Sequence, residues 1–591
     1  MMAWLGDRRP LLWLCSCLFV LGAAVRTNAA GEYRTVEVES LKITIDSEWG
    51  SRTGPGYVPV RFDITNLGEA RVIEIIGQGT RFSRLGRGAQ PGGTAVRQAV
   101  RMARGDRVRL TIPVPVFADN ENVRFEIRES GRTLERFSFS GFQSGLAPTS
   151  VGALIVADPA SEFGKVTASW PRMIKGPGTR APAPARMDFV LDPSRLPSNW
   201  LGFTSLRAVF IGPGEWGQLG DDQKAALLTW TAAGGDLFFV DGDVNALVGP
   251  AQRAVTADDR PVRAYFFGRV HPLASESVAP GGLATVVAAA DKLQDDNWAL
   301  PANRARDWGI IVARGFRLPI PGIDGVPARA YLTILILFSL LIGPVNYWFL
   351  WRRGRQVLLV LTAPVISAVF IVLLAGYVIA GEGLGVHGRA VTFTMLDQAR
   401  AQASMRASVS LYAAGMTPAG GLRFARDIAV FPIGRDGTGG RERQVLDLTD
   451  AQSFSAGVIE ARSPTNFEQI GVRPARERLT FSREAGGMGV VNGLGVTVTT
   501  LVYRAGGTAY TLTDRLPPGG RAIMTTDPVA ADAVVPQDMP LSARFVHLFG
   551  NQPEGSYLAV VDRSPFWDPG VSGVMERGSF HLVIGWPGGQ P

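Results

Sequence analysis

Short runs of alternating apolar and polar residues dominate the chain between residue 32 and about residue 145. The runs RTVEVESLKITID, YVPVRFDITNLG, RVIEIIG, DRVRLTIPVPV and NVRFEIRESGRTLERFSFSG follow one another, with Gly, Asn and Asp between them. Period-two alternation that is broken by turn residues about every ten positions is typical of antiparallel sandwiches. The pattern therefore predicts an N-terminal antiparallel β-sandwich over residues 30–147.

The pattern then changes to continuous apolar runs separated by a helical segment. VGALIVAD, LRAVFIG and DLFFVDGD are the apolar runs, and DDQKAALLTWTAAGG lies between the last two. Strand, helix and strand in this order predict a β-α-β unit in a parallel sheet. We expect the helix to begin near Asp221, with Ala225, Leu228 and Ala232 on one face. The prediction is an α/β domain over residues 148–326.

Two uncharged apolar stretches, 331–350 and 357–380, interrupt the chain. As helices, each is about long enough to cross the roughly 30 Å of hydrocarbon in a bilayer. The loop between them, 351–356, carries three arginines, and by the positive-inside rule it is expected to be cytoplasmic. We expect Asn346 to pair the two helices rather than to line a transport path, because two helices enclose no channel.

The remainder, residues 381–591, returns to short β-like runs such as VTFTML, ASVSLYAAG, GVTVTTLVYRAGGTAYTLTD, SYLAVVD and FHLVIGW. Gly-Gly and Pro-Gly breaks between these runs favour one or two further sandwich-like modules. The predicted fold is therefore multidomain, with two transmembrane helices between an α/β domain and a C-terminal β-rich region.

Residues 1–29 have the layout of a secretory signal peptide, with two arginines, an apolar run and small residues at its end. An uncleaved membrane anchor is the alternative. Both cysteines, Cys15 and Cys17, lie in this run. The mature chain would then have no disulfide, no Cys-ligated zinc and no thiol nucleophile, unless a lipoprotein cleavage preserved Cys17.

Composition supports a folded, exported membrane protein rather than a nucleic-acid binder. Hydrophobic residues make up 46% and charged residues 19% of the 591 positions. The net charge of +8 comes from arginines that are scattered among acidic residues, so no basic patch is predicted. The expected partners are membrane lipid and other envelope proteins, with no nucleic acid.

GPGEWG, at residues 212–217, satisfies the pattern G-x-G-x-x-G that binds dinucleotides at a strand-turn-helix junction. Pro213 removes a backbone donor, and the predicted helix start near Asp221 lies too far from the glycines to meet a pyrophosphate. Export also separates the turn from cytosolic cofactor. We therefore predict no nucleotide and no other cofactor.

WLGF at residues 200–203, followed by LRAVFIG and LGDDQKAALLTWTAAGGDLFFVDG, resembles the core of class I glutamine-amidotransferase-like domains, which are flavodoxin-like. Catalytic members use a cysteine with a distant histidine. This chain has no cysteine in that region, and His271, in a segment with no assigned element, is the histidine nearby. The resemblance implies an amidotransferase-like fold without amidotransferase activity, serving as a platform.

The order of the segments carries a second resemblance. A signal, a β-sandwich, an amidotransferase-like domain, the hairpin LIGPVNYWFLWRRGR and a β-rich tail resemble a loosely defined set of bacterial envelope membrane proteins. The GPVNY motif before an arginine-rich loop is the most recognisable part, and YVPVRFDITN resembles a strand region of immunoglobulin-like modules. This likeness implies an architecture and not an activity.

Four carboxylates, Asp158, Glu215, Asp241 and Asp243, each follow a predicted strand. Ligands of open α/β sheets gather at the carboxyl ends of the strands, so converging carboxylates would suit a divalent cation. Turn formation and helix capping are the favoured alternative. The four histidines have no metal-binding spacing, and no G-x-S-x-G motif is present; no metal or catalytic residue is predicted.

The sequence thus favours a non-catalytic membrane-anchored envelope protein that acts in protein interaction or assembly through exported domains. One alternative is an accessory subunit of an ABC-type export or gliding-type machine. Another is an unusual hydrolase that uses the carboxylate cluster.

Overall fold

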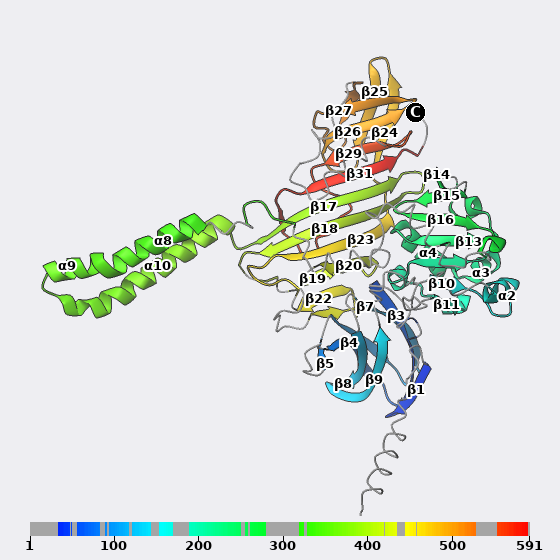
Figure 1. Cartoon of the computed structure of the whole chain (residues 1–591), viewed down its shortest axis with the longest axis horizontal. Coiled ribbons are helices and arrows are strands. Elements are labelled where there is room, and N and C mark those ends of the chain that lie inside the picture. The colour runs from blue at the N-terminus through cyan, green and yellow to red at the C-terminus, as the bar shows by residue number, and fades with distance from the viewer. Residues whose placement is uncertain are drawn as a thin grey trace, which may run out of the picture.

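The structure is a computed structural model of the 591-residue chain. It describes residues 33–47, 49, 56–82, 89–91, 94–116, 121–142, 153–169, 188–249, 254–257, 260–278, 286, 318–323, 328–415, 417–418, 420–433, 444–456, 458–526 and 552–588. The predicted signal peptide, both cysteines and His547 lie outside these residues. What is described is a multidomain, strongly β-rich protein with several sheets and two apolar helices (Figure 1).

The first sheet of the N-terminal region is antiparallel and has four strands in the order β1-β2-β3-β7. Its strands are β1 (Tyr33–Val38), β2 (Leu41–Asp46), β3 (Gly56–Asn66) and β7 (Arg107–Val116). From Val60 to Asn66 alternate side chains of β3 are buried, as the sequence pattern predicts for a half-buried strand, whereas residues 56–60 are all buried. Phe62 from this sheet meets Phe125 of the second sheet edge to face, with ring centroids 5.2 Å apart.

The second sheet has eight strands, and it combines strands of the N-terminal region with strands from residues 422–456. It runs β19-β22-β21-β6-β4-β8-β9, with β5 beside β4. The strands are β4 (Arg71–Phe82), β5 (Ala89–Pro91), β6 (Ala95–Met102), β8 (Glu121–Glu129), β9 (Arg132–Phe142), β19 (Leu422–Phe424), β21 (Val445–Asp447) and β22 (Gln452–Ala456). From the sequence, the last three are expected in the separate region 381–591, whereas in the structure they extend the sheet of the N-terminal sandwich.

The junction between these two parts is the parallel pair β6 and β21. Leu446 lies opposite Val96, and both are fully buried. The N–H of Ala95 donates to the carbonyl of Gln444, and the N–H of Leu448 donates to the carbonyl of Arg97, each at 2.8 Å. This pairing gives β6 a neighbour on its second edge.

The α/β region contains a seven-stranded sheet in the order β11-β10-β12-β13-β16-β15-β14. Its strands are β10 (Ala153–Val156), β11 (Asp188–Leu191), β12 (Ala208–Ile211), β13 (Asp236–Val240), β14 (Ala254–Ala257), β15 (Arg260–Tyr265) and β16 (Gly268–Leu273). The first five in this order are parallel. Counted along the chain these five run 2-1-3-4-5, an order shared by flavodoxin-like sheets.

Short helices connect these strands. They are α2 (Glu162–Ser169), η1 (Pro193–Arg195), η2 (Trp200–Phe203), α3 (Pro213–Gln218), α4 (Asp221–Ala232), α5 (Val244–Val248) and η3 (Ser275–Val278). Helix α4 begins at Asp221 as expected; of the three residues on the predicted face, Ala232 is buried and Leu228 is half-buried. Ala225 is exposed, whereas Leu227 and Trp230 are fully buried. The indole of Trp230, which packs 6.1 Å from the ring of Phe203, sets the face, because it is the largest apolar side chain of the helix.

The C-terminal region forms a nine-stranded sheet and a three-stranded sheet. The larger sheet runs β20-β23-β18-β17-β31-β29-β26-β27, with β30 beside β17, and the smaller runs β24-β25-β28. The strands are β17 (Val386–Asp397), β18 (Gln402–Ala413), β20 (Ile428–Ile433), β23 (Thr465–Pro474), β24 (Arg478–Glu484), β25 (Gly487–Gly493), β26 (Val498–Ala505), β27 (Thr508–Leu512), β28 (Arg521–Met524), β29 (Tyr557–Val561), β30 (Met575–Glu576) and β31 (Phe580–Trp586).

The α/β region docks on the larger C-terminal sheet through the end of α4. The Ser404 hydroxyl donates to the carbonyl of Ala232 at 2.9 Å, and the Arg406 guanidinium donates to that of Ala233 at 2.5 Å. Carbonyls at a helix C-terminus have no partner within the helix. The N–H of Phe267 within the α/β region also donates to the carbonyl of Ala232, at 3.2 Å, and strand β18 adds the side-chain donors of Ser404 and Arg406.

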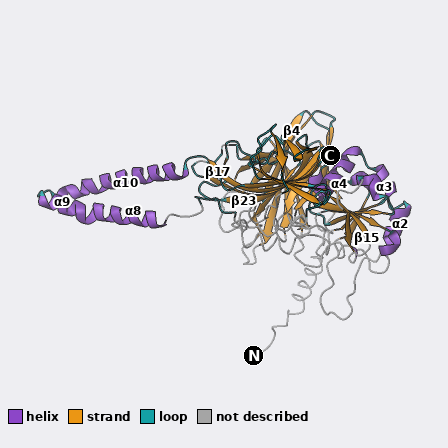
Figure 2. Ribbon diagram, turned by 90° about the horizontal axis from the view of Figure 1, so that it is seen from above, coloured by secondary structure: helices purple, strands orange, loops and turns teal. Residues whose placement is uncertain are grey.

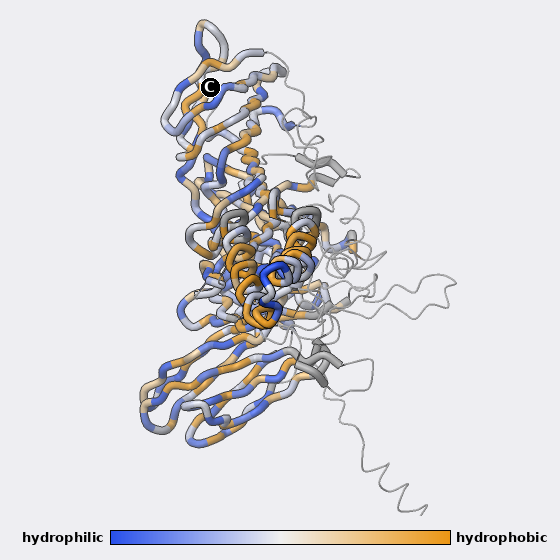
Figure 3. Tube along the Cα trace, turned by 90° about the vertical axis from the view of Figure 1, so that its left-hand side faces the viewer, coloured by the Kyte–Doolittle hydropathy of each residue, from blue (hydrophilic) through white to orange (hydrophobic). Residues whose placement is uncertain are grey.

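The helical hairpin projects from the body of the protein (Figures 1 and 2). It consists of α8 (Ala328–Leu340), the π-helical segment η4 (Leu341–Val345), α9 (Asn346–Arg352), η5 (Gln356–Leu358) and α10 (Leu359–Glu382). Leu332–Arg352 and Gln356–Tyr377 are long and apolar enough to cross a membrane, with mean hydropathies of 1.8 and 2.9. Only 6% and 0% of these spans are buried in the protein, and Figure 3 shows mainly apolar helices with a polar tip.

Two features shape the hairpin internally. Pro344 lies in η4, where the wider π-helical turn accommodates a residue that has no N–H to donate. Asn346 is buried; its Nδ2 donates to Thr362 Oγ1 at 2.9 Å, and Thr362 Oγ1 contacts Asn346 Oδ1 at 3.1 Å. The expectation that Asn346 pairs the two helices is confirmed by this contact.

Candidate functional site

The carboxyl edge of the parallel sheet is where the sequence places its four candidate carboxylates. Strands β10, β12 and β13 end together, because Val156 lies opposite Ile211 and Ile211 lies opposite Phe239. All four carboxylates follow these ends, as the strand assignment predicts: Asp158 after β10, Glu215 in α3, and Asp241 and Asp243 after β13. They share one edge of the sheet.

Asp158 and Glu215 meet around Ser161. The Ser161 hydroxyl lies 2.8 Å from the Asp158 carbonyl and 2.7 Å from Glu215 Oε1, and it accepts the N–H of Gly164 at 2.9 Å. The Asp158 carboxylate itself accepts the N–H of Ala160 at 2.8 Å. Glu215 is 2% exposed. These are the contacts of a turn and a helix N-cap, with the buried glutamate held by the capping serine.

Asp241 and Asp243 serve the turns beyond β13. Asp241 has a left-handed backbone with φ of 55°, and its Oδ1 accepts the N–H of Ser275 at 2.9 Å. Asp243 is the N-cap of α5 and accepts the N–H of Asn245 at 2.9 Å. Both are exposed. Within the described residues, no group of three or more His, Cys, Asp or Glu side chains is placed to hold a metal ion.

The glycine turn at 212–217 differs from the sequence expectation in one respect. Helix α3 begins at Pro213, so a helix does start directly at the glycines, ahead of α4. It has six residues, and its first turn contains the buried Glu215. A Cβ placed on Gly212 would lie 2.7 Å from Glu215 Oε2. A carboxylate thus borders the space that a phosphate would enter, and like charges repel there.

His271 belongs to strand β16 and is buried, so it has a regular element where the sequence analysis assigned none. Its Nε2 lies 3.0 Å from Asp236 Oδ1, and Arg269 binds both oxygens of the same carboxylate at 2.9 and 3.0 Å. The imidazole stacks on Phe238 at 4.5 Å. Asp236 opens β13, so this ionic cluster lies at the amino end of the sheet, away from the edge where ligands bind.

A hydroxyl, an imidazole and a carboxylate form a relay in the C-terminal sheet that the sequence analysis missed. Thr392 Oγ1 lies 2.9 Å from His581 Nδ1, and His581 Nε2 lies 3.0 Å from Glu576 Oε2. Burial alone would raise the pKa of Glu576, but the hydrogen bonds from His581 and Ser579 and the nearby positive charges together outweigh it, and the pKa is lowered. Thr392 and His581 are 0% and 1% exposed. A substrate could not reach this hydroxyl, so the relay is a structural one.

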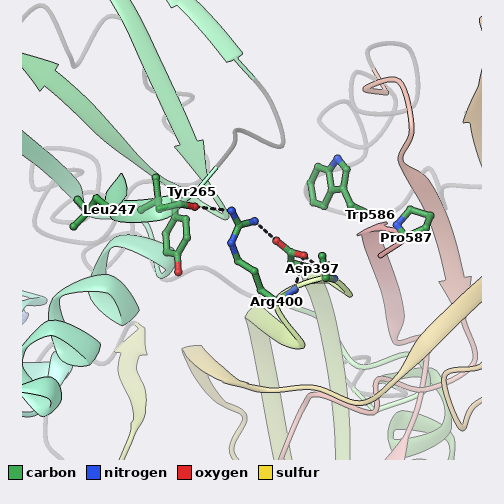
Figure 4. Close-up of a pocket in the computed structure, with 9 residues that line it drawn as sticks. Leu247, Tyr265, Asp397, Arg400, Trp586 and Pro587 are labelled. Atoms are coloured by element: carbon green, nitrogen blue, oxygen red, sulfur yellow. Dashed lines mark hydrogen bonds and ion pairs between the residues drawn. The ribbon is translucent and has the colours of Figure 1, made fainter. Parts of the chain in front are cut away.

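A cleft of about 570 Å³ lies where the α/β region meets the larger C-terminal sheet (Figure 4). Its lining consists of Leu247, Val248, Gly249, Tyr265, Asp397, Ala399, Arg400, Trp586 and Pro587. These residues come from the end of α5, the end of β15, the turn after β17 and the end of β31. Figure 4 shows Tyr265 and Trp586 on opposite sides of the Asp397–Arg400 pair.

Arg400 forms hydrogen bonds to residues on both sides of the cleft. Its guanidinium donates to the carboxylate of Asp397 and, at 2.5 Å, to the carbonyl of Val248 in α5. Asp397 also accepts the N–H of Arg400 at 3.0 Å. Burial raises the pKa of Tyr265, so its hydroxyl stays protonated and contacts Gln402 Oε1 at 3.4 Å. The side chains are held in place, and none of them is paired as a nucleophile with a base.

The cleft is lined by residue types that are enriched in protein binding sites. Trp, Tyr and Arg are the residues that contribute most to protein binding sites, and clefts between domains are preferred positions for them. The lining comes from segments separated by up to about 340 positions, from Leu247 to Pro587. No sequence motif marks this cleft, because its segments meet only where the two domains dock.

Comparison with protein-family models gives no match, and comparison with curated protein sequences gives none either. Among solved structures, a cycloisomaltooligosaccharide glucanotransferase from Paenibacillus sp., in complex with cycloisomaltoheptaose, is similar at 14% identity and a TM-score of 0.14. The match covers 35% of this chain and 28% of that one. A TM-score of this size supports no argument about fold or function.

Proposed function

We propose that this protein is a non-catalytic component of a bacterial envelope, anchored in the plasma membrane and acting in protein interaction or assembly through exported domains. In this proposal the hairpin crosses the membrane twice, with its arginine loop at 351–356 in the cytoplasm. The domains before and after the hairpin are both exported. The α/β region is an amidotransferase-like platform that has lost its nucleophile.

The observation that carries the proposal is the way both ends of the hairpin join one body (Figure 2). Arg389 of β17, just after the hairpin, donates to the carbonyl of Pro319, just before it, at 2.8 Å. Ile320 packs against Tyr412 of β18. Since the two flanking segments are bound to each other, they lie on the same side of any membrane that the hairpin crosses.

The contacts of the polar residues support a non-catalytic role. The four candidate carboxylates are occupied in turns and caps, and the Thr392–His581 pair is closed to solvent. The parallel strand order supports the amidotransferase-like proposal at the level of topology. The interdomain cleft supports an interaction role through its tryptophan, tyrosine and arginine.

Site-specific photo-crosslinking in cells tests the interaction role. A photoreactive amino acid at Trp586 or Leu247 is expected to give a discrete adduct, whereas the exposed Thr480 of β24 serves as a matched control and gives none. A cross-linked ABC-type permease would make the protein an accessory subunit. Equal labelling at all three positions would contradict an interaction at the cleft. Loss of cellular function in a folded D241N/D243N variant would favour the hydrolase alternative instead.

A further inference from the structure

The tip of the hairpin holds three exposed arginines with no carboxylate to neutralise them. They are Arg352, Arg353 and Arg355, at the end of α9 and in the following turn. The chain has no Asp or Glu between Asp324 and Glu382. None of the three guanidinium groups has an ion-pair partner among the described residues. Three positive charges within one turn of chain are therefore open to a counter-charge from outside the protein.

Two of these arginines are held in place by aromatic rings. The guanidinium of Arg352 lies 4.1 Å from the ring centre of Trp348, and that of Arg353 lies 4.1 Å from the ring centre of Phe349. Each pair is spaced i, i+4 at the end of α9, where side chains are neighbours. A guanidinium over the face of a ring can still donate its N–H groups to another acceptor. The stacking thus orders both groups before any ligand binds.

The surrounding side chains place the tip at the depth of lipid headgroups. Tyr347, Trp348 and Trp351 are 54%, 49% and 57% exposed, although they are large and apolar. Tyrosine and tryptophan gather at the interface between hydrocarbon and water, where an apolar ring and a polar tip are both accommodated. The arginines directly follow these rings along the chain, so they lie among the phosphates.

We propose that the hairpin tip is a binding site for the phosphate group of an anionic phospholipid. Arginine binds phosphate oxygens in a bidentate geometry that lysine cannot reproduce. A net charge of three favours a lipid with a net negative headgroup over a zwitterionic one, because the latter carries its own cation. The site would hold the hairpin against the anionic leaflet and select its lipid neighbours. The proposal of this lipid site rests on the proposed membrane anchoring of the hairpin.

Native mass spectrometry of the full chain tests the site. The protein is released from vesicles of equal parts phosphatidylglycerol and phosphatidylcholine, and the retained lipids are counted. At roughly fivefold for each arginine near the surface, three arginines are expected to give a preference for phosphatidylglycerol on the order of 100-fold. R352Q/R353Q/R355Q is expected to lose this preference. R352K/R353K/R355K keeps the charge but not the bidentate geometry, so it should retain only part of the preference.

Controls separate this site from general charge and from free phosphate. R104Q/R478Q/R483Q removes the same charge from exposed positions on the body and is expected to leave the preference unchanged. Equal loss in that variant, or an unchanged preference in the tip variant, would overturn the proposal. Displacement of phosphatidylglycerol by 10 mM inorganic phosphate, roughly the scale of a weak ion site, would show recognition of the free ion rather than the lipid.

Flotation with phosphatidylcholine vesicles after an alkaline wash distinguishes failure of the lipid site from failure of the membrane anchoring. Wild type that floats but shows no preference for phosphatidylglycerol would overturn the lipid site alone. Wild type that does not float would overturn the membrane anchoring, and the lipid site with it.

Discussion

Asp46 is a buried carboxylate shared by two domains. At the end of β2 it binds Arg61 of β3 at 2.5 Å and Arg195 of η1 at 2.9 Å. Arg61 also donates to the carbonyl of Arg195 at 2.8 Å. Burial alone would raise the pKa of Asp46, but the hydrogen bond from Arg195 and the charges of both arginines outweigh it, and the pKa is lowered.

Because the pKa of Asp46 is lower in the folded state than in the unfolded state, the ionised group stabilises the fold above the unfolded pKa of about 4. This contribution is lost as the pH falls through the folded pKa. We expect D46N to lower the free energy of unfolding by about 2 kcal/mol at pH 7. The difference from wild type should shrink below about pH 4, as measured by urea unfolding at both pH values.

Asp63 supplies the control for this prediction. It pairs with Arg107 and Arg109 on the surface, and its pKa is lowered as well, chiefly by the hydrogen bond from Arg107. Exposed pairs contribute little, so D63N is expected to cost less than about 1 kcal/mol. Equal effects of D46N and D63N, or a D46N deficit that persists at low pH, would contradict the role given to Asp46.

At the scale of elements, the end of helix α4 is packed against the β15–β16 hairpin without space for a side chain. A Cβ on Gly268 would lie 1.9 Å from the carbonyl oxygen of Thr231 and 2.5 Å from that of Gly235. Both are backbone atoms, so neither can move aside alone. A Cβ placed on Gly217 of α3, by contrast, would lie in open space.

We therefore expect G268A to destabilise the α/β region by about 3 kcal/mol, the upper part of the range for overpacking. G217A is the matched control and is expected to be neutral or to stabilise by up to about 1 kcal/mol, since alanine is the better helix former. Hydrogen exchange of the amides in α4 provides the measurement. Unchanged protection in G268A would show that the helix can shift away from β16 at little cost.

Sequence periodicity predicts those elements whose signals are local. The two apolar spans, the capping aspartate Asp243 and the partnership of Asn346 with the facing helix follow from spacing and residue type. The buried face of α4 does not follow from spacing and residue type, because the orientation of the helix depends on the side chain against which Trp230 packs. The position of His271 in β16 is likewise not local information, because its polar partner Asp236 comes from β13, 35 positions earlier.

At the scale of the whole molecule, the N-terminal sandwich is not closed by its own strands. Its second sheet ends at β6 unless β21 and β22 are added from residues 445–456. A parallel contact between segments this far apart leaves no mark in either local sequence. The cleft around Arg400 is missed for the same reason, since it exists only where two docked domains meet.

An isolated fragment of residues 30–147 is expected to self-associate, because β6 would present an unpaired edge and Val96 would lose its cover. Fusing residues 420–456 to this fragment by a flexible linker should restore a monomer that unfolds cooperatively. Size-exclusion chromatography and thermal unfolding measure both properties. The same fusion with Leu446→Asp is the control, and a monomeric, cooperatively unfolding 30–147 fragment would contradict the prediction.

The pairing of β6 with β21 also determines how late in synthesis β6 gains its neighbouring strand. Ala99 of β6 binds Thr449 just beyond β21, and 350 positions separate them. At the usual synthesis rate of about 5–20 residues per second, β6 is complete roughly 20 to 70 s before its neighbour exists. During that time the α/β region, the hairpin and the strands β17, β18 and β20 are made, while one edge of β6 has no partner. A holding chaperone that covers strand edges would matter most in this interval, before about the last quarter of the protein has been made.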